Sequence, residues 1–302
     1  MFDRFFPRSI KVSPHFGAIF QALFVTFLWS TSWVIIKFGL ADIPALTFAG
    51  LRYMGAFLCL LPFTLTRASF SSFNGLSLRD WMRLILLGVL FYTLTQGAQF
   101  LALAYLPAVT VSLLLNFSTT TVALMGMVFL AERPRPIQWA GICLNLIGIF
   151  VYFYPAAFPT GQVLGIVVAL VGVAANAGSS ILGRYVNRMG SISPLQVTTV
   201  SMGVGATLLL VTGLLTQGLP HLSLSNWVAI GWLAIVNTAF AFTLWNRTLR
   251  VLSAMESSII NSTMLIQIAV LAWVFLGESV TWLEGIGMFL AGIGVLIVQL
   301  RR

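Results

Sequence analysis

Two basic residues interrupt long apolar stretches of this sequence and are its clearest candidates for chemistry. Arg52 lies eight residues beyond Pro44, about 12 Å along a helix that rises about 1.5 Å per residue. A guanidinium at that depth in a membrane costs about 3 kcal/mol or more unless it is paired or faces a polar cavity. Arg52 is therefore a contact for a substrate carboxylate or a gate, or else a structural bridge to helix-end carbonyls.

Lys37 is the second basic residue within an apolar stretch, and it falls in the last turn of the first predicted helix. A cation is favoured at a helix C-terminus, and a lysine there can extend its ammonium group to the outer surface. Lys37 is thus either such a structural residue or a gating residue.

Three glutamates are candidates for gating or coupling. Glu132 and Glu278 follow matching segments and are expected in hairpins on opposite membrane faces. They either exchange partners as gates or stabilise their hairpins. Glu256 is an acid that could lie within a span, but Ser253 three residues earlier gives it the pattern of a capping box. Proton coupling through Glu256 is the alternative.

Uncharged polar residues recur in many of the apolar stretches, and several aromatic residues accompany them. One or two buried polar residues would be ordinary interhelical contacts worth about 0.6 kcal/mol each, whereas so many indicate a wet cavity. Aromatic residues near span ends also form interfacial belts, so Trp29, Tyr92 and Trp245 have two possible roles. Together with Arg52, the candidate substrate-binding residues are Trp29, Ser32, Tyr92, Gln96, Asn116, Asn176, Asn237, Trp245 and Asn261.

The sequence offers no set of residues suited to catalysis, to a metal or to a cofactor. Its histidines are His15 and His221, and HExxH, GxSxG and Walker A motifs are missing. Cys59 and Cys143 lie inside apolar runs without CxxC spacing. We therefore expect a protein that is not an enzyme; the alternatives are an intramembrane enzyme acting on lipid, or a channel or structural assembly partner.

Composition identifies the elements that must position these residues. Of the 302 residues, 59% are hydrophobic and 8% charged, against about 25% charged in soluble domains. At about 20 apolar residues per span, the sequence predicts an all-α membrane protein of ten transmembrane helices. They are expected near 17–38, 45–66, 81–104, 107–130, 136–154, 162–184, 194–216, 225–247, 253–276 and 281–300.

The basic residues predict how this bundle is oriented. All but two of the 16 lysines and arginines fall in the N-terminal segment, in alternate connections or at the C-terminus. Cytoplasmic loops are enriched in such residues, so both termini are predicted on the cytoplasmic side of a bacterial inner membrane. The net charge of +9 then requires no nucleic acid partner.

The sequence also contains an internal repeat. Residues 104–149 align without a gap on residues 250–295, an offset of 146, and the matches include Glu132 with Glu278, Gly141 with Gly287 and Gly148 with Gly294. Five helices in each half require the second half to be inverted in the membrane, as in many secondary transporters. We expect a cytoplasmic segment 1–16, a first five-helix repeat 17–154 and a second, inverted repeat 155–302.

With these features the sequence resembles the EamA-type carriers of the drug/metabolite transporter superfamily. The resemblance rests on the segment from Leu28 to Lys37, on Pro44 and Arg52, and on the blocks ending at Glu132 and Glu278. It implies ten helices in two inverted halves around a central cavity, and export of small solutes such as amino acids, drugs or other metabolites.

The sequence departs from the family pattern at Thr119 and Leu265, where proline is common, at Ala175-Asn176, where tryptophan is usual, and at Ser30, where glycine is usual. The predicted function is a secondary transporter of neutral or zwitterionic amphipathic solutes, with amino acids favoured, that works by alternating access across the cytoplasmic membrane. Export is the favoured direction. The expected partners are a small-molecule substrate and the lipid bilayer, and whether the protein is a monomer or a homo-oligomer is left open.

Overall fold

The computed structural model of the protein describes residues 14–64, 75–130, 135–154, 160–189, 193–248, 251–252 and 260–299. Within these ranges the structure consists of helices and contains no strand. The helices are α1 (Pro14–Gly39), α2 (Ala45–Thr64), α4 (Leu78–Gly88), η1 (Val89–Gln96), α5 (Gly97–Tyr105), α6 (Ala108–Leu130), α7 (Pro136–Tyr152), α8 (Thr160–Met189), α9 (Pro194–Gln217), α10 (Leu224–Ala234), η2 (Ile235–Phe240), α11 (Ala241–Thr248), α13 (Met264–Leu276) and α14 (Trp282–Gln299).

The described residues include six helices that are long and apolar enough to cross a membrane. They span His15–Gly39, Ala45–Thr64, Leu78–Tyr105, Gly161–Gly183, Pro194–Gln217 and Leu224–Trp245. Shorter apolar helices cover Ala108–Val122, Pro136–Tyr152, Ile260–Leu276 and Trp282–Val298. The prediction of an all-helical membrane protein is thereby confirmed.

Serine caps set the starts of several helices. Ser77 begins α4, where its Oγ accepts from Asp80 N at 3.3 Å and the Asp80 carboxylate bonds back to Ser77 N. Ser193 and Ser223 cap α9 and α10 in the same way, each accepting from the backbone N–H three residues later. The helix predicted from residue 81 therefore begins three residues earlier, at Leu78.

Two helices contain a π-helical segment that the apolar pattern did not predict. The first, η1, continues α4 into α5, and the second, η2, continues α10 into α11. In each segment a threonine hydroxyl, Thr95 or Thr238, donates at 2.8 Å to the carbonyl five residues earlier. The segments begin at Val89 and Ile235, which are separated by the same 146 residues as the two sequence repeats.

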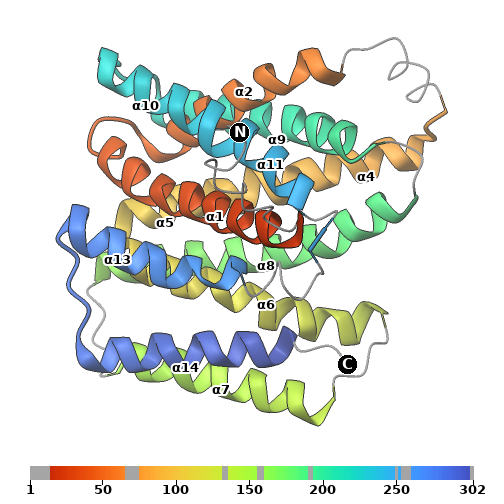
Figure 1. Ribbon diagram of the computed structural model, residues 1–302. Coiled ribbons are helices and arrows are strands. Elements are labelled where there is room, and N and C mark those ends of the chain that lie inside the picture. The colour runs from red at the N-terminus through yellow and green to blue at the C-terminus, as the bar shows by residue number, and fades with distance from the viewer. Residues whose placement is uncertain are drawn as a thin grey trace, which may run out of the picture.

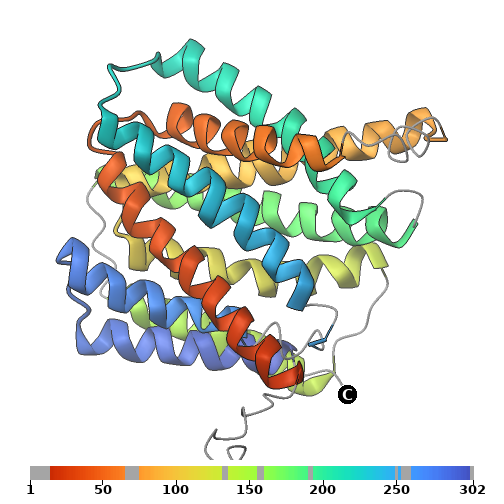
Figure 2. The ribbon, with the colours of Figure 1, turned by 45° about the horizontal axis from the view of Figure 1, so that its top comes forward.

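The helices lie in layers. Figure 1 shows α2, α9 and α10 along one edge, α1, α5 and α8 in the middle, and α7 with α14 along the opposite edge. Figure 2 shows α1 running obliquely beside α10 and α11. A core of buried side chains, including Phe48, Phe100 and Leu103, occupies the middle of this arrangement.

Two antiparallel helices, α7 and α14, are in close contact through glycines. A Cβ atom at Gly141 would lie 2.8 Å from Gly294 O, and one at Gly287 would lie 2.7 Å from Gly148 O. Gly141 and Gly287 are equivalent in the sequence repeat, as are Gly148 and Gly294. The two contacts are therefore related by the repeat: replacing each glycine of one contact by its equivalent in the other half gives the other contact.

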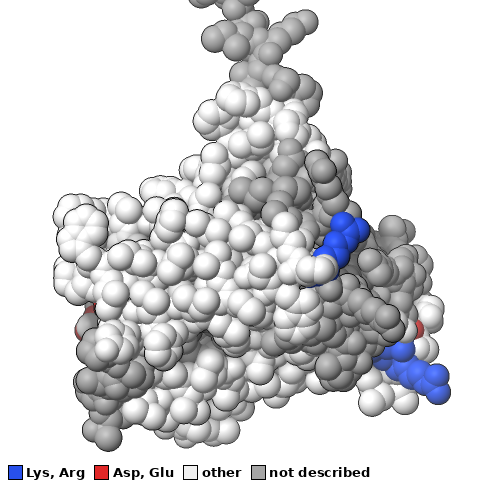
Figure 3. All heavy atoms as spheres, turned by 90° about the horizontal axis from the view of Figure 1, so that it is seen from below, with Lys and Arg blue, Asp and Glu red and all other residues white. Residues whose placement is uncertain are grey.

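The basic side chains seen on one face of the molecule gather toward one end of it (Figure 3). Figure 3 shows a face that is almost free of charge, with the lysines and arginines drawn there gathered at its right-hand end. Large hydrophobic side chains such as Phe150, Trp282 and Phe289 are exposed on α7 and α14. An exposed apolar face bounded by a basic end suits a surface in contact with lipid.

Candidate functional site

Arg52 lies in the interior of the bundle on α2. It is 5% exposed, and its Nε donates to the Thr238 hydroxyl of η2 at 3.0 Å. Its Cζ lies 5.2 Å from the centre of the Tyr53 ring and 5.8 Å from that of Phe100, within the range of a cation–π interaction. Its described hydrogen bond is thus made to a hydroxyl group and not to helix-end carbonyls.

Tyr53, the next residue of α2, contacts the other π-helical segment. Its hydroxyl donates to Gln96 Oε1 at 2.6 Å, and its ring packs edge-to-face on Tyr92 with the centroids 5.7 Å apart. Tyr92 is buried and also packs on Phe91. Three predicted site residues, Arg52, Tyr92 and Gln96, are therefore brought together through Tyr53.

Consecutive residues of α2 thus connect the two π-helical segments: Arg52 binds η2 and Tyr53 binds η1. We refer to Arg52, Tyr53, Tyr92, Gln96, Phe100 and Thr238 as the Arg52 cluster. π-Helical turns occur frequently at functional sites. Their presence on both sides of a buried arginine identifies this cluster as the centre of the candidate site.

Asn237, which precedes Thr238, joins η2 to α1. Its side chain is fully buried, and its Nδ2 donates to Leu28 O, to Thr31 Oγ1 at 3.1 Å and to Ser32 Oγ at 2.9 Å. Its Oδ1 is enclosed without a hydrogen-bond partner among the described residues. Ser32 and Asn237, both predicted site residues, are in direct contact.

Aromatic side chains extend this contact between α1 and α11. The Trp29 ring lies 5.2 Å from Phe242 and 5.2 Å from Trp245, with tilted planes. Its Nε1 is enclosed and unbonded among the described residues. Trp29 and Trp245 therefore pack on each other. Their role in lining a cavity stays a prediction.

Lys37 and Glu278 bind backbone groups at helix ends. The Lys37 ammonium donates to Leu103 O and Leu106 O, both at 2.7 Å, at the C-terminal end of α5. Glu278 accepts from the first backbone N–H groups of α6. Lys37 is half-buried, and its ammonium group is held by these two carbonyl groups at the end of α5.

The other predicted residues lie apart from these contacts. Asn116 Nδ2 donates to Ser112 O of its own helix. The backbone carbonyl of Asn176 accepts from the hydroxyl groups of Ser179 and Ser180. Asn261 is exposed near the start of α13. Glu132 and Glu256 lie outside the described residues. The binding and gating roles of all these residues stay predictions.

Comparison with known proteins identifies the family. The EamA-like transporter family profile matches residues 16–154 and again residues 163–300. The chain belongs to the EamA-like transporter family. The resemblance found in the sequence is confirmed, and the protein is a membrane transporter of that family.

Several EamA-like relatives span most of the chain. The uncharacterized inner membrane transporter YedA of Escherichia coli (strain K12) is 25% identical over 98% of this chain and 94% of its own. The S-adenosylmethionine/S-adenosylhomocysteine transporter of Chlamydia trachomatis is 25% identical over 87% and 83%. A crystal structure at 19% identity superimposes with a TM-score of 0.66 over 93% of this chain and 97% of its own, which supports the fold.

Several residues of the site in this EamA-like protein are not among the candidate binding residues predicted from the sequence. Tyr53 and Thr238 make the contacts that connect Arg52 to the π-helical segments, and Phe100 faces the guanidinium. Gln267 joins α13 to α1, where it accepts from Ser30 Oγ at 2.9 Å. Signals for both residues were present in the sequence: Tyr53 follows Arg52, and Thr238 is one of the polar residues that recur in apolar stretches.

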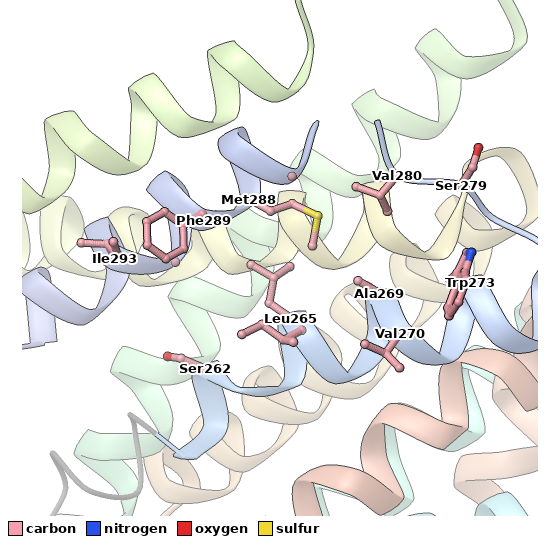
Figure 4. Close-up of a pocket in the computed structure, with 13 residues that line it drawn as sticks. Ser262, Leu265, Ala269, Val270, Trp273, Ser279, Val280, Met288, Phe289 and Ile293 are labelled. Atoms are coloured by element: carbon pink, nitrogen blue, oxygen red, sulfur yellow. The ribbon is translucent and has the colours of Figure 1, made fainter. Parts of the chain in front are cut away.

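The described surface also contains an apolar groove of about 600 Å³ between α13 and α14. Figure 4 shows Leu265, Ala269 and Met288 lining it from the two helices. Trp273 and Phe289, which also line it, are 66% and 68% exposed. No charged residue lines it, so it suits hydrocarbon chains of the membrane better than a polar substrate.

Proposed function

We propose that this EamA-like protein is a secondary transporter that carries small amphipathic metabolites by alternating access across the cytoplasmic membrane of a bacterium. It has ten transmembrane helices, arranged as two inverted five-helix repeats that move relative to each other. Export is the favoured direction, as the family resemblance implies. The central site contains the Arg52 cluster and the neighbouring contact between Asn237 and α1.

The observation that carries this proposal is the pair of π-helical segments. They begin 146 residues apart in corresponding helices and are joined by consecutive residues of α2. Transporters with inverted repeats bind substrates near the midplane, at irregular helices where the repeats meet. The reciprocal glycine contacts between α7 and α14 also fit an inverted relation of the halves.

Both termini are proposed to be cytoplasmic. The described arginines near helix ends, such as Arg79, Arg135 and Arg247, belong to the connections assigned to the cytoplasm from the sequence. The name of the Escherichia coli relative gives its location as the inner membrane. Addition of a fluorescent reporter to the C-terminus would test this orientation.

The favoured substrates are neutral or zwitterionic solutes, with amino acids first. The site combines a buried cation, amides and aromatic rings, a set of groups suited to a small molecule with polar and apolar parts. The chlamydial relative is named for a substrate that contains an amino-acid group. S-adenosylmethionine therefore belongs among the compounds to be tested.

Counterflow in proteoliposomes tests the proposal directly. Purified full-length protein is loaded with an unlabelled solute, and uptake of the same labelled solute is followed for amino acids, nucleosides, organic cations and S-adenosylmethionine. Saturable exchange that is faster than in protein-free liposomes supports a carrier. Flux that does not saturate would instead support a channel, and loss of exchange for every compound tested contradicts the proposal.

A further inference from the structure

Arg52 lacks a carboxylate partner among the described residues. The ion pair among the described residues lies elsewhere: it joins Arg83 and Asp80 near the start of α4. Thr238 is a neutral partner, and the rings of Tyr53 and Phe100 attract the guanidinium without neutralising it. A buried cation of this kind is costly unless an anion is supplied.

The guanidinium also has unused hydrogen-bond donors. Its Nε is bonded to Thr238, while neither Nη atom donates to a described residue. Described buried atoms that are enclosed without a partner are Trp29 Nε1, Ser118 Oγ and Asn237 Oδ1. The Nη atoms are not among them, so the guanidinium is not completely enclosed by described atoms.

Gln96 adds a second donor to the same cluster. Its Oε1 accepts from the Tyr53 hydroxyl at 2.6 Å, which leaves its Nε2 group without an acceptor among the described residues. Tyr53 lies between the two, with its ring against Arg52 and its hydroxyl on Gln96. The Arg52 cluster therefore has more free donors than acceptors, a property of an anion-binding site.

The charge of the cluster limits the kind of anion. Arg52 supplies one positive charge, and the ammonium of Lys37, the other basic residue within an apolar stretch, is already bound to Leu103 O and Leu106 O. One carboxylate group matches a single cation, whereas a dianionic phosphate ester would place an excess negative charge beside Arg52 in the membrane interior. The planar fork of arginine also matches the geometry of a carboxylate.

We propose that Arg52 and Gln96 bind the carboxylate group of the transported solute. The carboxylate supplies the missing counter-ion, and Tyr53, Tyr92 and Phe100 form an aromatic wall beside it. This inference rests on the proposed transport function and adds the chemical group by which the substrate is recognised.

Binding of matched acids and amides to the detergent-purified full-length protein tests the proposal. The probes are benzoate with benzamide, phenylalanine with phenylalaninamide, and methyl phosphate as a dianion, and the readout is the shift in unfolding temperature with ligand concentration. We expect the acids to stabilise the wild type and the amides to have little effect. Arg52→Gln should weaken acid binding about tenfold or more, since hydrogen bonds to charged groups are worth about 1.5–3 kcal/mol.

Further variants keep the test valid if Arg52→Gln does not fold. Arg52→Lys retains the charge without the planar fork and should bind acids more weakly than the wild type. Gln96→Ala should reduce acid binding while the charge remains. Arg79→Gln, at an exposed position of α4, removes one positive charge elsewhere and should bind acids as the wild type does.

Three results would overturn the proposal. They are no stabilisation of the wild type by acids, binding of amides or methyl phosphate that is as tight as binding of carboxylates, and an unchanged preference for acids in folded Arg52→Gln.

Counterflow distinguishes failure of this carboxylate assignment from failure of the transport function. Saturable exchange of solutes without a carboxylate, retained by Arg52→Gln, would leave a carrier but remove the carboxylate assignment. Acid-selective binding without exchange of any acid would instead contradict transport.

Discussion

Glu278 and Ala108 are joined by a hydrogen bond of 2.7 Å from the backbone N–H of Ala108 to Glu278 Oε1, and Val109 N donates to the other carboxylate oxygen at 3.1 Å. Gly277 ends α13 with a φ of 67° in the left-handed region, and Glu278 N bonds back to Ala272 O. The carboxylate satisfies two N–H groups at the start of α6. One side chain at the end of α13 thus connects it to the start of α6 through two residues that lie 170 positions apart in the chain.

Glu278→Gln should destabilise the protein by about 1 kcal/mol. The amide keeps one acceptor oxygen, but its NH2 group would face a backbone N–H, and the favourable charge at the helix N-terminus would be lost. Thermal unfolding of the detergent-purified protein, followed by tryptophan fluorescence, measures this loss. Asp42→Asn, at an exposed position, is the control, and an equal shift in both variants would count against the capping role.

Lys37→Met should destabilise the protein by about 1–3 kcal/mol, the usual penalty for leaving buried polar groups unbonded. Methionine retains an apolar stem of similar length but leaves Leu103 O and Leu106 O without their donor. Lys37→Arg should retain part of the stability because it can still donate to carbonyls. The same unfolding assay checks both variants, and wild-type stability of Lys37→Met would exclude this structural role.

Asn237→Asp should reduce both stability and transport more than Asn237→Ala does. The aspartate has nearly the same shape, but it replaces the Nδ2 donor with an acceptor that faces Leu28 O. It would also place a charge at a fully buried position. We expect the free energy of unfolding of Asn237→Asp to be lower than that of Asn237→Ala by about 1 kcal/mol or more.

Asn116 provides the matched control for this comparison, because its amide bonds to Ser112 O within its own helix. Asn116→Asp and Asn116→Ala should differ less from each other than the two Asn237 variants do. If aspartate at position 237 were tolerated as well as alanine, the bond from Nδ2 to Leu28 O could not be the contact that holds α1 against η2.

The class of fold and the places of its helices could be predicted from the sequence because both depend on local features. Apolar stretches marked the spans, and charged or proline-containing connections marked their ends. Where a boundary was wrong, as at Leu78, the reason was also local: the capping box of Ser77 and Asp80 was present in the sequence but was not used. Serine capping signals improve such boundaries.

The site could be predicted only in part, because its contacts join residues far apart in the chain. Arg52 and Asn237 were recognisable as polar residues in apolar stretches, but the bond from Arg52 to Thr238 spans 186 residues. In the π-helical segments, threonine hydroxyls bond to carbonyls five residues earlier, a contact that gives no periodic signal in the sequence. Lys37 was correctly assigned to a helix end, while its partners on α5 could not be known.

The glycine contacts between α7 and α14 allow a prediction with opposite signs at two positions. A methyl group at Gly148 would collide with Ala291 N and would lie 2.6 Å from Gly287 O, whereas one at Gly292 would meet no atom within 4 Å. Gly148→Ala should therefore push the helices apart and destabilise the protein by about 1–3 kcal/mol. Gly292→Ala should be neutral or stabilise it by about 0.5–1 kcal/mol, because alanine in a helix is more favourable than glycine.

Unfolding temperatures of the two variants, measured side by side, check the contrast. Equal effects of the same sign would mean that α7 and α14 do not pack at this distance in the membrane.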